Sequence, residues 1–592
     1  MKAKHWFLLS FLSLLTISLA ACGKNSSKPA TNHVDLPSSY SAKGKAVSTG
    51  NSTLRVAEVN DAPFKGISLA VLQDMVEDQD VYSPGGLETL FKADNNFKIV
   101  NGGLANQKLD RKKNTVTITL RKNARWSDGK PVIARDVEYA YEIIGNQNTT
   151  SSQYSSDFAR IKGMAAYHNG KAKTISGITY PDGQNGKQVV IKYSKLAPSM
   201  EYLGNSFVWG SVVPYHKLKG IKISKLASSK PVRKNPVFTG PYKLAKQVDG
   251  ESTSWVRNKY YYGPKPKIGK VQIQVVSTTN SLAAFKANKY DFALGSLPTS
   301  QYQNASKIKG YAMTGRPSTS YSYFGFNLGH FDTKKNVNVT DKNMKMGNKK
   351  LRQAMMYAIN LDQMYKKLFN GVSWRANTLI LPNFKQYYDK KNPGFPYNPK
   401  KANQLLDEAG YKKKGKWRVQ PNGKPLTIYY GAAEGSSTLQ AIYQQELQEW
   451  HKVGLNVKMA TGKPMDINSF YTTISEPKQN KIDIFDAGWQ VTSDPTPTQL
   501  YGADAAYNMG HFVSKKNTEL INAINSDKAW NSSYRTKKFK EWQRYMNDEA
   551  AYTPDSYSFS FTPVNKRLKN YYSTNAVNYF VPSFWQNLAM TK

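Results

Sequence analysis

Residues Leu120–Val132 read LRKNARWSDGKPV, and this stretch decides the fold more than any other part of the 592-residue chain. Just before it, residues 116–120 alternate valine, isoleucine and leucine with threonine, a period of two that predicts a half-buried β-strand. Residues 127–129, Ser-Asp-Gly, then combine residue types that favour a tight turn. A helix is expected to begin near Arg135, so the stretch predicts a strand, a turn and a helix in succession.

Strand-like and helix-like patterns alternate through the rest of the chain. Short β-branched runs predict further strands, whereas apolar residues at intervals of three and four predict helices that pack one face into a core. The apolar content of 40% is typical of a globular protein, and the mixture of elements predicts α/β or α+β lobes. The clearest strands are expected at 54–57, 189–191, 271–275 and 426–428, and the clearest helices at 351–359, 399–409, 439–447 and 539–546.

The N-terminal residues predict export. Two lysines precede an apolar run over residues 6–19, which is shorter than the ~20 residues that span a bilayer and is typical of a signal peptide. Cys22 is the only cysteine of the chain and directly follows small residues, an arrangement that resembles the lipobox of bacterial lipoproteins. The resemblance implies removal of residues 1–21, acylation of Cys22 and a Gram-positive-type lipid anchor on the outer face of the cell membrane. The polar composition predicts a flexible tether over 22–52.

The charge balance is strongly basic, with 83 Lys and Arg against 41 Asp and Glu and a formal net charge of +42. Such a balance can indicate nucleic-acid binding, but the positive residues are spread in short clusters along the chain, and the predicted export argues against that partner. Outside a cell, the same charge favours contact with anionic cell-wall polymers and lipid headgroups. No nucleic-acid partner is therefore expected, and a basic surface lipoprotein that binds the wall is one alternative function.

Motifs of enzyme chemistry are missing from the sequence. No G-x-S-x-G elbow occurs, no cysteine other than Cys22 is present, and the seven histidines include no H-E-x-x-H pair. Residues Gly410–Lys416 have the spacing of a phosphate-binding loop, but Trp417 stands where a hydroxyl group must hold magnesium. The sequence therefore predicts neither an enzyme nor a metal or other cofactor site.

Several motifs together carry a family resemblance. The Leu120–Val132 stretch and the helix expected after it resemble the signature of the large extracellular solute-binding proteins that serve peptide and nickel importers of the ABC type. The resemblance extends over residues 54–592, and the length and N-terminal cysteine are similar to those of oligopeptide-binding lipoproteins of Gram-positive bacteria. The matching positions are Ala134, Asp136, Val137 and Tyr141 in that helix, Asn235-Pro236 with Thr239–Tyr242, Arg257–Pro266 and Leu351–Asn360.

The resemblance implies a two-lobed α/β fold of the type II periplasmic-binding-protein class, with the ligand enclosed between the lobes. The first lobe would hold residues 53–325 and 557–592, with an extra subdomain over 90–204, and the second lobe would hold residues 326–556. The family's activity implies a monomer that binds oligopeptides without altering them and passes them to an ABC permease with its ATPases. A nickel chelate, haem or a sugar is an alternative solute for the same fold.

The resemblance also implies the ligand-binding residues. It places an acid for the α-ammonium group of a peptide shortly after a tryptophan of the second lobe, which points to Asp494 after Trp489. The spacing is five residues where three is common in relatives, so Asp486 is a rival for this role. Trp489 and Gly488 are expected to wall the cleft, and Tyr82 is expected to contribute from the first lobe. Asp494 could instead only cap an Asp-Pro turn, and Tyr82 could be a buried loop aromatic.

Overall fold

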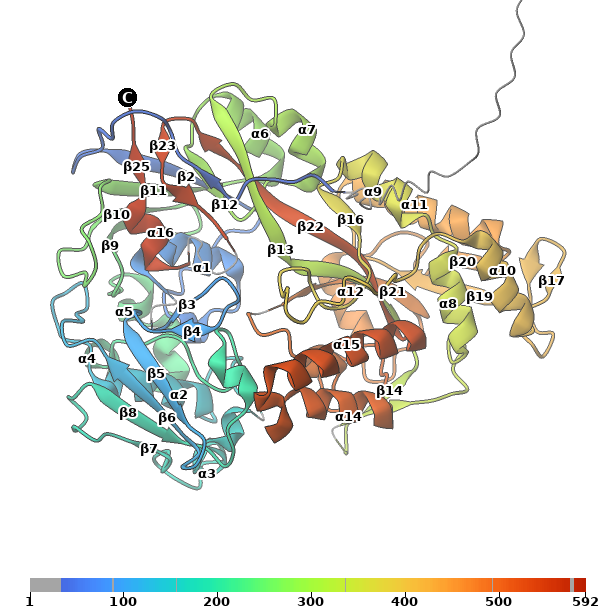
Figure 1. The fold of residues 1–592 in the computed structure, drawn as a ribbon, viewed down its shortest axis with the longest axis horizontal. Coiled ribbons are helices and arrows are strands. Elements are labelled where there is room, and N and C mark those ends of the chain that lie inside the picture. Colours follow the sequence, from blue (N-terminus) through green and yellow to red (C-terminus); the bar gives the residue numbers. More distant parts are fainter. Residues whose placement is uncertain (1–32, 88–89, 156, 336, 492, 575–579) are drawn as a thin grey trace, which may run out of the picture.

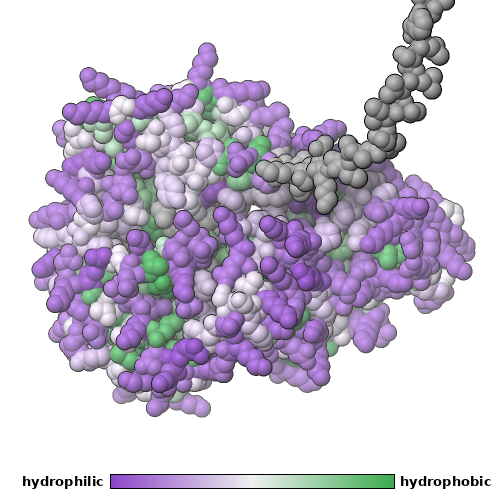
Figure 2. Space-filling model, in the orientation of Figure 1, coloured by the Kyte–Doolittle hydropathy of each residue, from purple (hydrophilic) through white to green (hydrophobic). Residues whose placement is uncertain are grey.

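The computed structural model describes residues 33–87, 90–155, 157–335, 337–491, 493–574 and 580–592. The predicted signal peptide and Cys22 lie outside the described residues, and the predictions made for them stay predictions. None of the helices in the described part combines the length and the apolar character needed to cross a membrane. The face of the molecule shown in Figure 2 is mainly hydrophilic, with scattered hydrophobic patches.

Two lobes of mixed α/β structure lie side by side, each around its own sheet (Figure 1). The first lobe contains a five-stranded sheet in the order β12-β2-β11-β10-β9, in which β2 lies parallel to both of its neighbours. The side chains of Trp255 and Phe292 are completely buried in its core. The elements of this lobe are β2 (Thr53–Val59), α1 (Val76–Tyr82), β9 (Tyr242–Val248), β10 (Ser252–Arg257), β11 (Lys270–Val276), α6 (Thr278–Lys286), β12 (Phe292–Leu294) and α7 (Tyr302–Ala305).

A four-stranded antiparallel sheet, in the order β5-β6-β8-β7, forms a subdomain below the first lobe in Figure 1. The subdomain has its own apolar core, in which Val116, Ile118 and Val189 are completely buried. Its elements are β5 (Ala105–Asp110), β6 (Thr115–Leu120), α2 (Ala134–Gly145), α3 (Met164–His168), β7 (Ile178–Thr179) and β8 (Gln188–Lys192).

The Leu120–Val132 stretch connects β6 to α2, which confirms the predicted succession of strand, turn and helix. The turn depends on Gly129, whose φ of +91° lies in the left-handed region that glycine adopts without strain. A Cβ atom at this position would also lie only 2.9 Å from the ring of Tyr260. Any other residue at position 129 would therefore strain the turn and displace the tyrosine.

Two buried polar groups hold the turn against the helix. The indole Nε1 of Trp126 donates a hydrogen bond to the Asp136 carboxylate at 3.0 Å. The same carboxylate accepts the backbone N–H groups of Ile133 and Tyr215 at 2.9 and 3.0 Å. Burial nevertheless raises the pKa of Asp136 to about 6. This part of the signature is thus a buried framework for the subdomain.

The second lobe contains a six-stranded mixed sheet in the order β16-β22-β13-β21-β19-β20, flanked by helices. Helices α8, α10, α11 and α15 coincide with the four helices predicted from the apolar periodicity. The elements are α8 (Lys349–Tyr357), α9 (Leu361–Phe369), β16 (Ser373–Arg375), α10 (Pro399–Glu408), β19 (Thr427–Gly431), α11 (Ser437–Lys452), β20 (Asn456–Met459), α12 (Ile467–Ile474), β21 (Ile484–Gln490), α13 (Thr498–Tyr501), α14 (Lys515–Ile524) and α15 (Ser532–Glu549).

Short elements complete the described part. Five pairs of short strands form separate two-stranded sheets in the described residues. These elements are β1 (Ser39–Tyr40) with β24 (Tyr571–Tyr572), β3 (Lys92–Ala93) with β4 (Ile99–Val100), β14 (Gly329–Asp332) with β15 (Val337–Thr340), β17 (Lys413–Lys414) with β18 (Trp417–Arg418), β23 (Leu568–Lys569) with β25 (Ala589–Met590), and the helices α4 (Tyr215–Leu218), α5 (Lys230–Arg233) and α16 (Pro582–Asn587).

Two long antiparallel strands, β13 (Tyr311–Phe326) and β22 (Tyr552–Asn565), run from one lobe into the other (Figure 1). At the first-lobe end, the Asn565 N–H donates to the Asp291 carbonyl at 2.7 Å. At the second-lobe end, β13 pairs with β21. The pairing of β13 with β22 shifts register between Pro317 and Tyr321, and an irregularity of this kind bends the strands locally. The predicted lobe borders at 325/326 and 556/557 fall within these two strands.

The N-terminal residues of the described part do not form the predicted tether. Residues 33–47, here called the strap, run along the folded body in dark blue in Figure 1. The Val34 N–H donates to the Gly371 carbonyl of the second lobe at 2.9 Å, and β1 pairs with β24 in the first lobe. The Val47 N–H donates to the Met590 carbonyl at 2.8 Å. The prediction of a flexible tether over 22–52 is therefore wrong for the strap, because its backbone groups are paired with both lobes.

The subdomain touches the second lobe directly beside α15 (Figure 1). The Tyr387 hydroxyl donates a hydrogen bond to the Tyr202 hydroxyl at 3.1 Å. The guanidinium group of Arg535 lies over the ring of Tyr202, 5.3 Å from its centroid. An ion pair also joins Lys195 of the subdomain to Asp527 of the second lobe at 2.8 Å. These contacts hold the two lobes in a closed arrangement at the end far from β13 and β22.

Candidate functional site

A cavity of about 250 Å³ lies beside β13, β21 and β22, against helices α9 and α11 of the second lobe. Thr299 of the first lobe also lines this cavity, so both lobes contribute to it. Sites for drug-sized ligands usually occupy roughly 300–1,000 Å³. The cavity is therefore large enough for one or two side chains of a longer ligand but too small for a whole peptide.

Serine hydroxyl groups line the strand side of the cavity. Along β22, serines alternate with aromatic residues, so the serines share one face of the sheet while the aromatic rings pack on the other. Each hydroxyl can both donate and accept a hydrogen bond, and its small size leaves space for a ligand. This alternation of serine with aromatic residues is visible at residues 556–561 of the sequence, although no ligand site was predicted from it. The lining serines are Ser320, Ser322, Ser373, Ser556 and Ser558.

Two aspartates from neighbouring parts of the sheet also line the cavity, Asp486 of β21 and Asp555 of β22. Asp555 lies at a second register shift between β13 and β22, since Ser556 and Pro554 have partners on β13 but Asp555 has none. Such a bulge redirects the side chain of the extra residue. The bulge thus brings Asp555 to the cavity that Asp486 already lines.

A third acid, Glu446 of α11, is buried next to the two aspartates. Tyr365 donates a hydrogen bond to Asp555 Oδ2 at 2.5 Å, and Tyr430 donates one to Glu446 Oε2 at 2.8 Å. The other carboxylate oxygens, Asp555 Oδ1 and Glu446 Oε1, are buried without a hydrogen-bond partner. Asp486, Asp555 and Glu446 are called the acid cluster below.

Burial is the main reason why the pKa values of the whole acid cluster are raised. Repulsion from Asp555 raises the pKa of Asp486 further, and both aspartates raise that of Glu446. The pKa of Asp555 rises to about 6, although its hydrogen bond from Tyr365 opposes the shift. Among the described residues, no lysine, arginine or histidine contributes to these shifts. The cavity therefore concentrates carboxyl groups without a compensating cation in a strongly basic chain.

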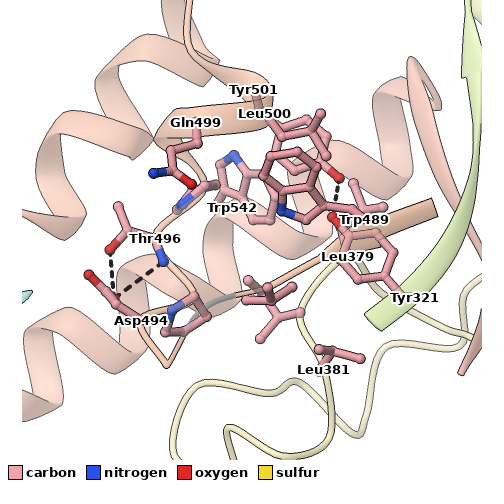
Figure 3. A pocket seen from close by; sticks show the side chains of 14 residues that line it. Tyr321, Leu379, Leu381, Trp489, Asp494, Thr496, Gln499, Leu500, Tyr501 and Trp542 are labelled. Atoms are coloured by element: carbon pink, nitrogen blue, oxygen red, sulfur yellow. Dashed lines mark hydrogen bonds between the residues drawn. The ribbon is translucent and has the colours of Figure 1, made fainter. Parts of the chain in front are cut away.

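Gly488 and Trp489 lie on opposite faces of β21. Gly488 lines the cavity, and a Cβ atom at this position would meet no atom within 4 Å. Trp489 instead packs on Tyr507, with ring centroids 5.2 Å apart, and lines a second pocket with Asp494 (Figure 3). This second pocket has a volume of about 20 Å³, which is space for about one water molecule. The structure thus brings Asp486 and Gly488 together in one cavity and separates Trp489 and Asp494 from it.

Asp494 already has a cationic partner in the structure. Its Oδ1 lies 3.5 Å from the guanidinium Nη2 of Arg535, and both side chains are buried, with 8% and 2% exposed. The same oxygen accepts the N–H and the hydroxyl of Thr496 at 3.3 and 2.8 Å (Figure 3). These contacts agree with the alternative of a turn-capping residue. The role of Asp494 toward a peptide ammonium group stays a prediction.

The structure does not bring Tyr82 to the cavity, and its predicted role toward a ligand stays a prediction. Tyr82 is the last residue of α1, and its side chain is completely buried in the core of the first lobe. The ring stacks on Phe238 with centroids 5.8 Å apart, and the hydroxyl donates to Gln247 Oε1 at 2.6 Å. These contacts agree with the alternative of a buried aromatic, because α1 directs the side chain inward and Gln247 satisfies its only polar group.

Over the described ranges, no group of three or more His, Cys, Asp or Glu residues is arranged to hold a metal ion. The cavity beside β13, β21 and β22 offers hydrogen bonding by serine hydroxyls and charge pairing by carboxylates.

Comparisons with known proteins place these features in a family. The profile of the bacterial extracellular solute-binding proteins, family 5 Middle, matches residues 100–511. The chain is 39% identical over 575 residues to the oligopeptide-binding protein OppA of Lactococcus lactis subsp. cremoris (strain SK11), covering 96% of this chain and 95% of that protein. The oligopeptide-binding protein AppA of Bacillus subtilis (strain 168) is 22% identical over 79% of this chain and 77% of its own.

A solved structure is similar over most of the molecule. Lactococcal OppA complexed with an endogenous peptide in the closed conformation superimposes with a TM-score of 0.81 and 37% sequence identity, covering 91% of this chain and 100% of that one. Family profile, sequence and two-lobed architecture agree over nearly the whole described part. The chain therefore belongs to family 5 of the bacterial extracellular solute-binding proteins.

Proposed function

We propose that this chain captures oligopeptides between its lobes and delivers them to the permease of an ABC importer. The observation that carries the proposal is the polar cavity lined by both lobes, in a chain similar over nearly its whole length to a protein named as oligopeptide-binding. The contacts between the subdomain and the second lobe support a clamp that closes around its ligand. The similarity to a solved structure with an endogenous peptide in the closed conformation adds further support.

Binding would depend mainly on groups that every peptide shares. The five serine hydroxyls of the cavity can pair with peptide N–H and C=O groups, and these groups are the same in every sequence. Water can fill the space that a small side chain leaves and can bridge the remaining polar groups. This combination gives broad peptide binding, and the closed form is stabilised only by the ligand's higher affinity for it.

Thermal unfolding and native mass spectrometry test this function together. A mixed library of 4- to 10-residue peptides should raise the melting temperature, because a ligand at ~100 times Kd adds about 2.7 kcal/mol to the free energy of unfolding. Native mass spectrometry of the protein purified from its host should show adducts with peptide masses. A haem, sugar or nickel-chelate mass without peptide, or no shift with any peptide, would contradict the proposal.

We further propose that the protein is anchored on the outside of the cell by acylated Cys22 and does not cleave its ligand. Replacing Cys22 by alanine should release the mature protein from the membrane fraction into the medium. Incubated peptides should keep their original masses. The dispersed positive charge should give a salt-sensitive contact with anionic wall polymers in addition to the anchor.

A further inference from the structure

The acid cluster has no partner in the described part that neutralises it. Asp555 is 2% exposed and Glu446 is 1% exposed, and each keeps one carboxylate oxygen without a hydrogen-bond partner. Asp555 and the partly exposed Asp486 both line the cavity, so an unpaired buried oxygen belongs to a residue that a ligand can reach. Main-chain recognition by serine hydroxyls does not require such a concentration of acids.

The groups around the acid cluster give it hydrogen bonds but no positive charge. Tyr365 of α9, Tyr430 of β19 and Ser556 of β22 each donate one hydrogen bond to it. Tyr323 of β13, Tyr443 of α11 and Tyr471 of α12 lie close enough for its charge to raise their pKa values. A buried carboxylate without a cation is costly, so the pKa values of all three acids are raised. A cation placed between them would remove this penalty.

We propose that the cavity binds a basic side chain of the captured peptide, a lysine ammonium or an arginine guanidinium, at Asp486 and Asp555. This inference rests on the proposed function and names the peptides that the site favours, which are those that place a lysine or arginine side chain in the cavity. The apolar wall suits the aliphatic stem of such a side chain, since long basic side chains bury their methylene groups along apolar surface. That wall consists of Phe369, Leu439 and Ile442.

Charge pairing at the cavity would couple peptide binding to proton release. Where part of the acid cluster is protonated in the free protein, a bound cation favours the ionised carboxylates and displaces protons to the solvent. The affinity for a lysine peptide should therefore rise between pH 5 and pH 8. A peptide with norleucine in place of lysine should show no such rise.

Isothermal titration calorimetry with matched peptides tests the inference. The probes are N-acetylated octapeptide amides of alanine and serine in which one lysine, or one norleucine, is moved through every position, and the same peptides with free amino groups. At one or more positions the lysine peptide should bind at least about tenfold tighter than the norleucine peptide, which corresponds to about 1.4 kcal/mol. Titration in two buffers with different ionisation enthalpies should then reveal released protons.

Isosteric variants test whether the preference for lysine over norleucine depends on the cavity. Asp486→Asn and Asp555→Asn should each remove most of the lysine preference, whereas the exposed Glu519→Gln on α14 should keep it. Asp486 is partly exposed, so its variant serves even if Asp555→Asn fails to fold. If the two aspartate variants keep the lysine preference and remove only a preference for the free amino group, the cavity binds the peptide terminus and the side-chain site is wrong.

The two proposals fail in different ways. If all peptides bind but lysine does not improve affinity at any position, or the lysine preference survives both aspartate substitutions, the cation site is wrong while peptide capture stands. If none of the peptides binds to the wild-type protein, the proposed function itself is contradicted.

Discussion

The Tyr387 hydroxyl of the second lobe donates a hydrogen bond to the Tyr202 hydroxyl of the subdomain at 3.1 Å. This bond bridges the lobes at the end far from β13 and β22, so it exists only while the clamp is closed. Arg535 stacks on both tyrosine rings and donates to the Tyr387 hydroxyl at 2.8 Å. A second bridge, between Lys195 and Asp527, is more than half exposed and should contribute little, on the order of 0–1 kcal/mol.

Tyr202→Phe should weaken the closed state. The substitution removes one net hydrogen bond, worth about 0.5–1.5 kcal/mol, and leaves the aromatic contact with Arg535 in place. Peptide dissociation should become roughly 2- to 10-fold faster, measured by stopped-flow fluorescence. Phenylalanine in place of the exposed Tyr572 is the matched control and should leave the rate unchanged. Equal rates for wild type and Tyr202→Phe would show that the bond does not contribute to closure.

Asp494 and Arg535 should behave as a structural pair. Arg535→Ala leaves Asp494 buried without its cation and should lower the free energy of unfolding by about 3–5 kcal/mol, measured by urea denaturation. Asp494→Asn should also destabilise the protein, but it should weaken the binding of free and of N-acetylated peptides to the same extent. Weaker binding of free peptides alone would restore Asp494 as the partner of the α-ammonium group.

The free protein should be stabilised by Asp555→Asn at neutral pH. Because burial raises the pKa of Asp555 to about 6, the folded state binds a proton more tightly than the unfolded state, so stability falls as the pH rises from about 4 through 6. Asparagine removes this loss and should add up to about 3 kcal/mol at pH 8 but almost nothing at pH 4. Thermal unfolding of wild type and variant in peptide-free buffers at pH 4 and pH 8 measures the difference. An equal gain in stability at the two pH values would contradict the prediction.

Removing the front of the strap should loosen the connection between the lobes. A protein lacking residues 1–38 loses the Val34–Gly371 hydrogen bond and the packing of Leu36, and should be less stable by about 1–2 kcal/mol than one lacking residues 1–32. Urea denaturation of the two proteins measures the difference. Identical midpoints would mean that the strap lies on the body without stabilising it.

Local patterns explain what the sequence could predict. The β6–turn–α2 unit and the four second-lobe helices depend on alternation, periodicity and turn chemistry within short windows. The acid cluster depends on the pairing of β13 with two distant strands and on a bulge at Asp555, and strand register cannot be derived from a single sequence. The ion pair of Asp494 with Arg535 likewise depends on how α15 packs. Tyr82 ends the short helix α1, and the local sequence does not distinguish so short a helix from a loop.

The strap also limits how far the protein can stand from the bilayer. Val34 is bonded to Gly371 and follows Cys22 by 12 residues, so in a protein anchored at an acylated Cys22 this point of the body can lie at most ~40 Å from the anchor. If the connection were free up to residue 52, the corresponding distance would be roughly 100 Å. So short a distance would keep the loaded protein close to its permease. Successive rounds of delivery would then need only small movements, without diffusion through the wall.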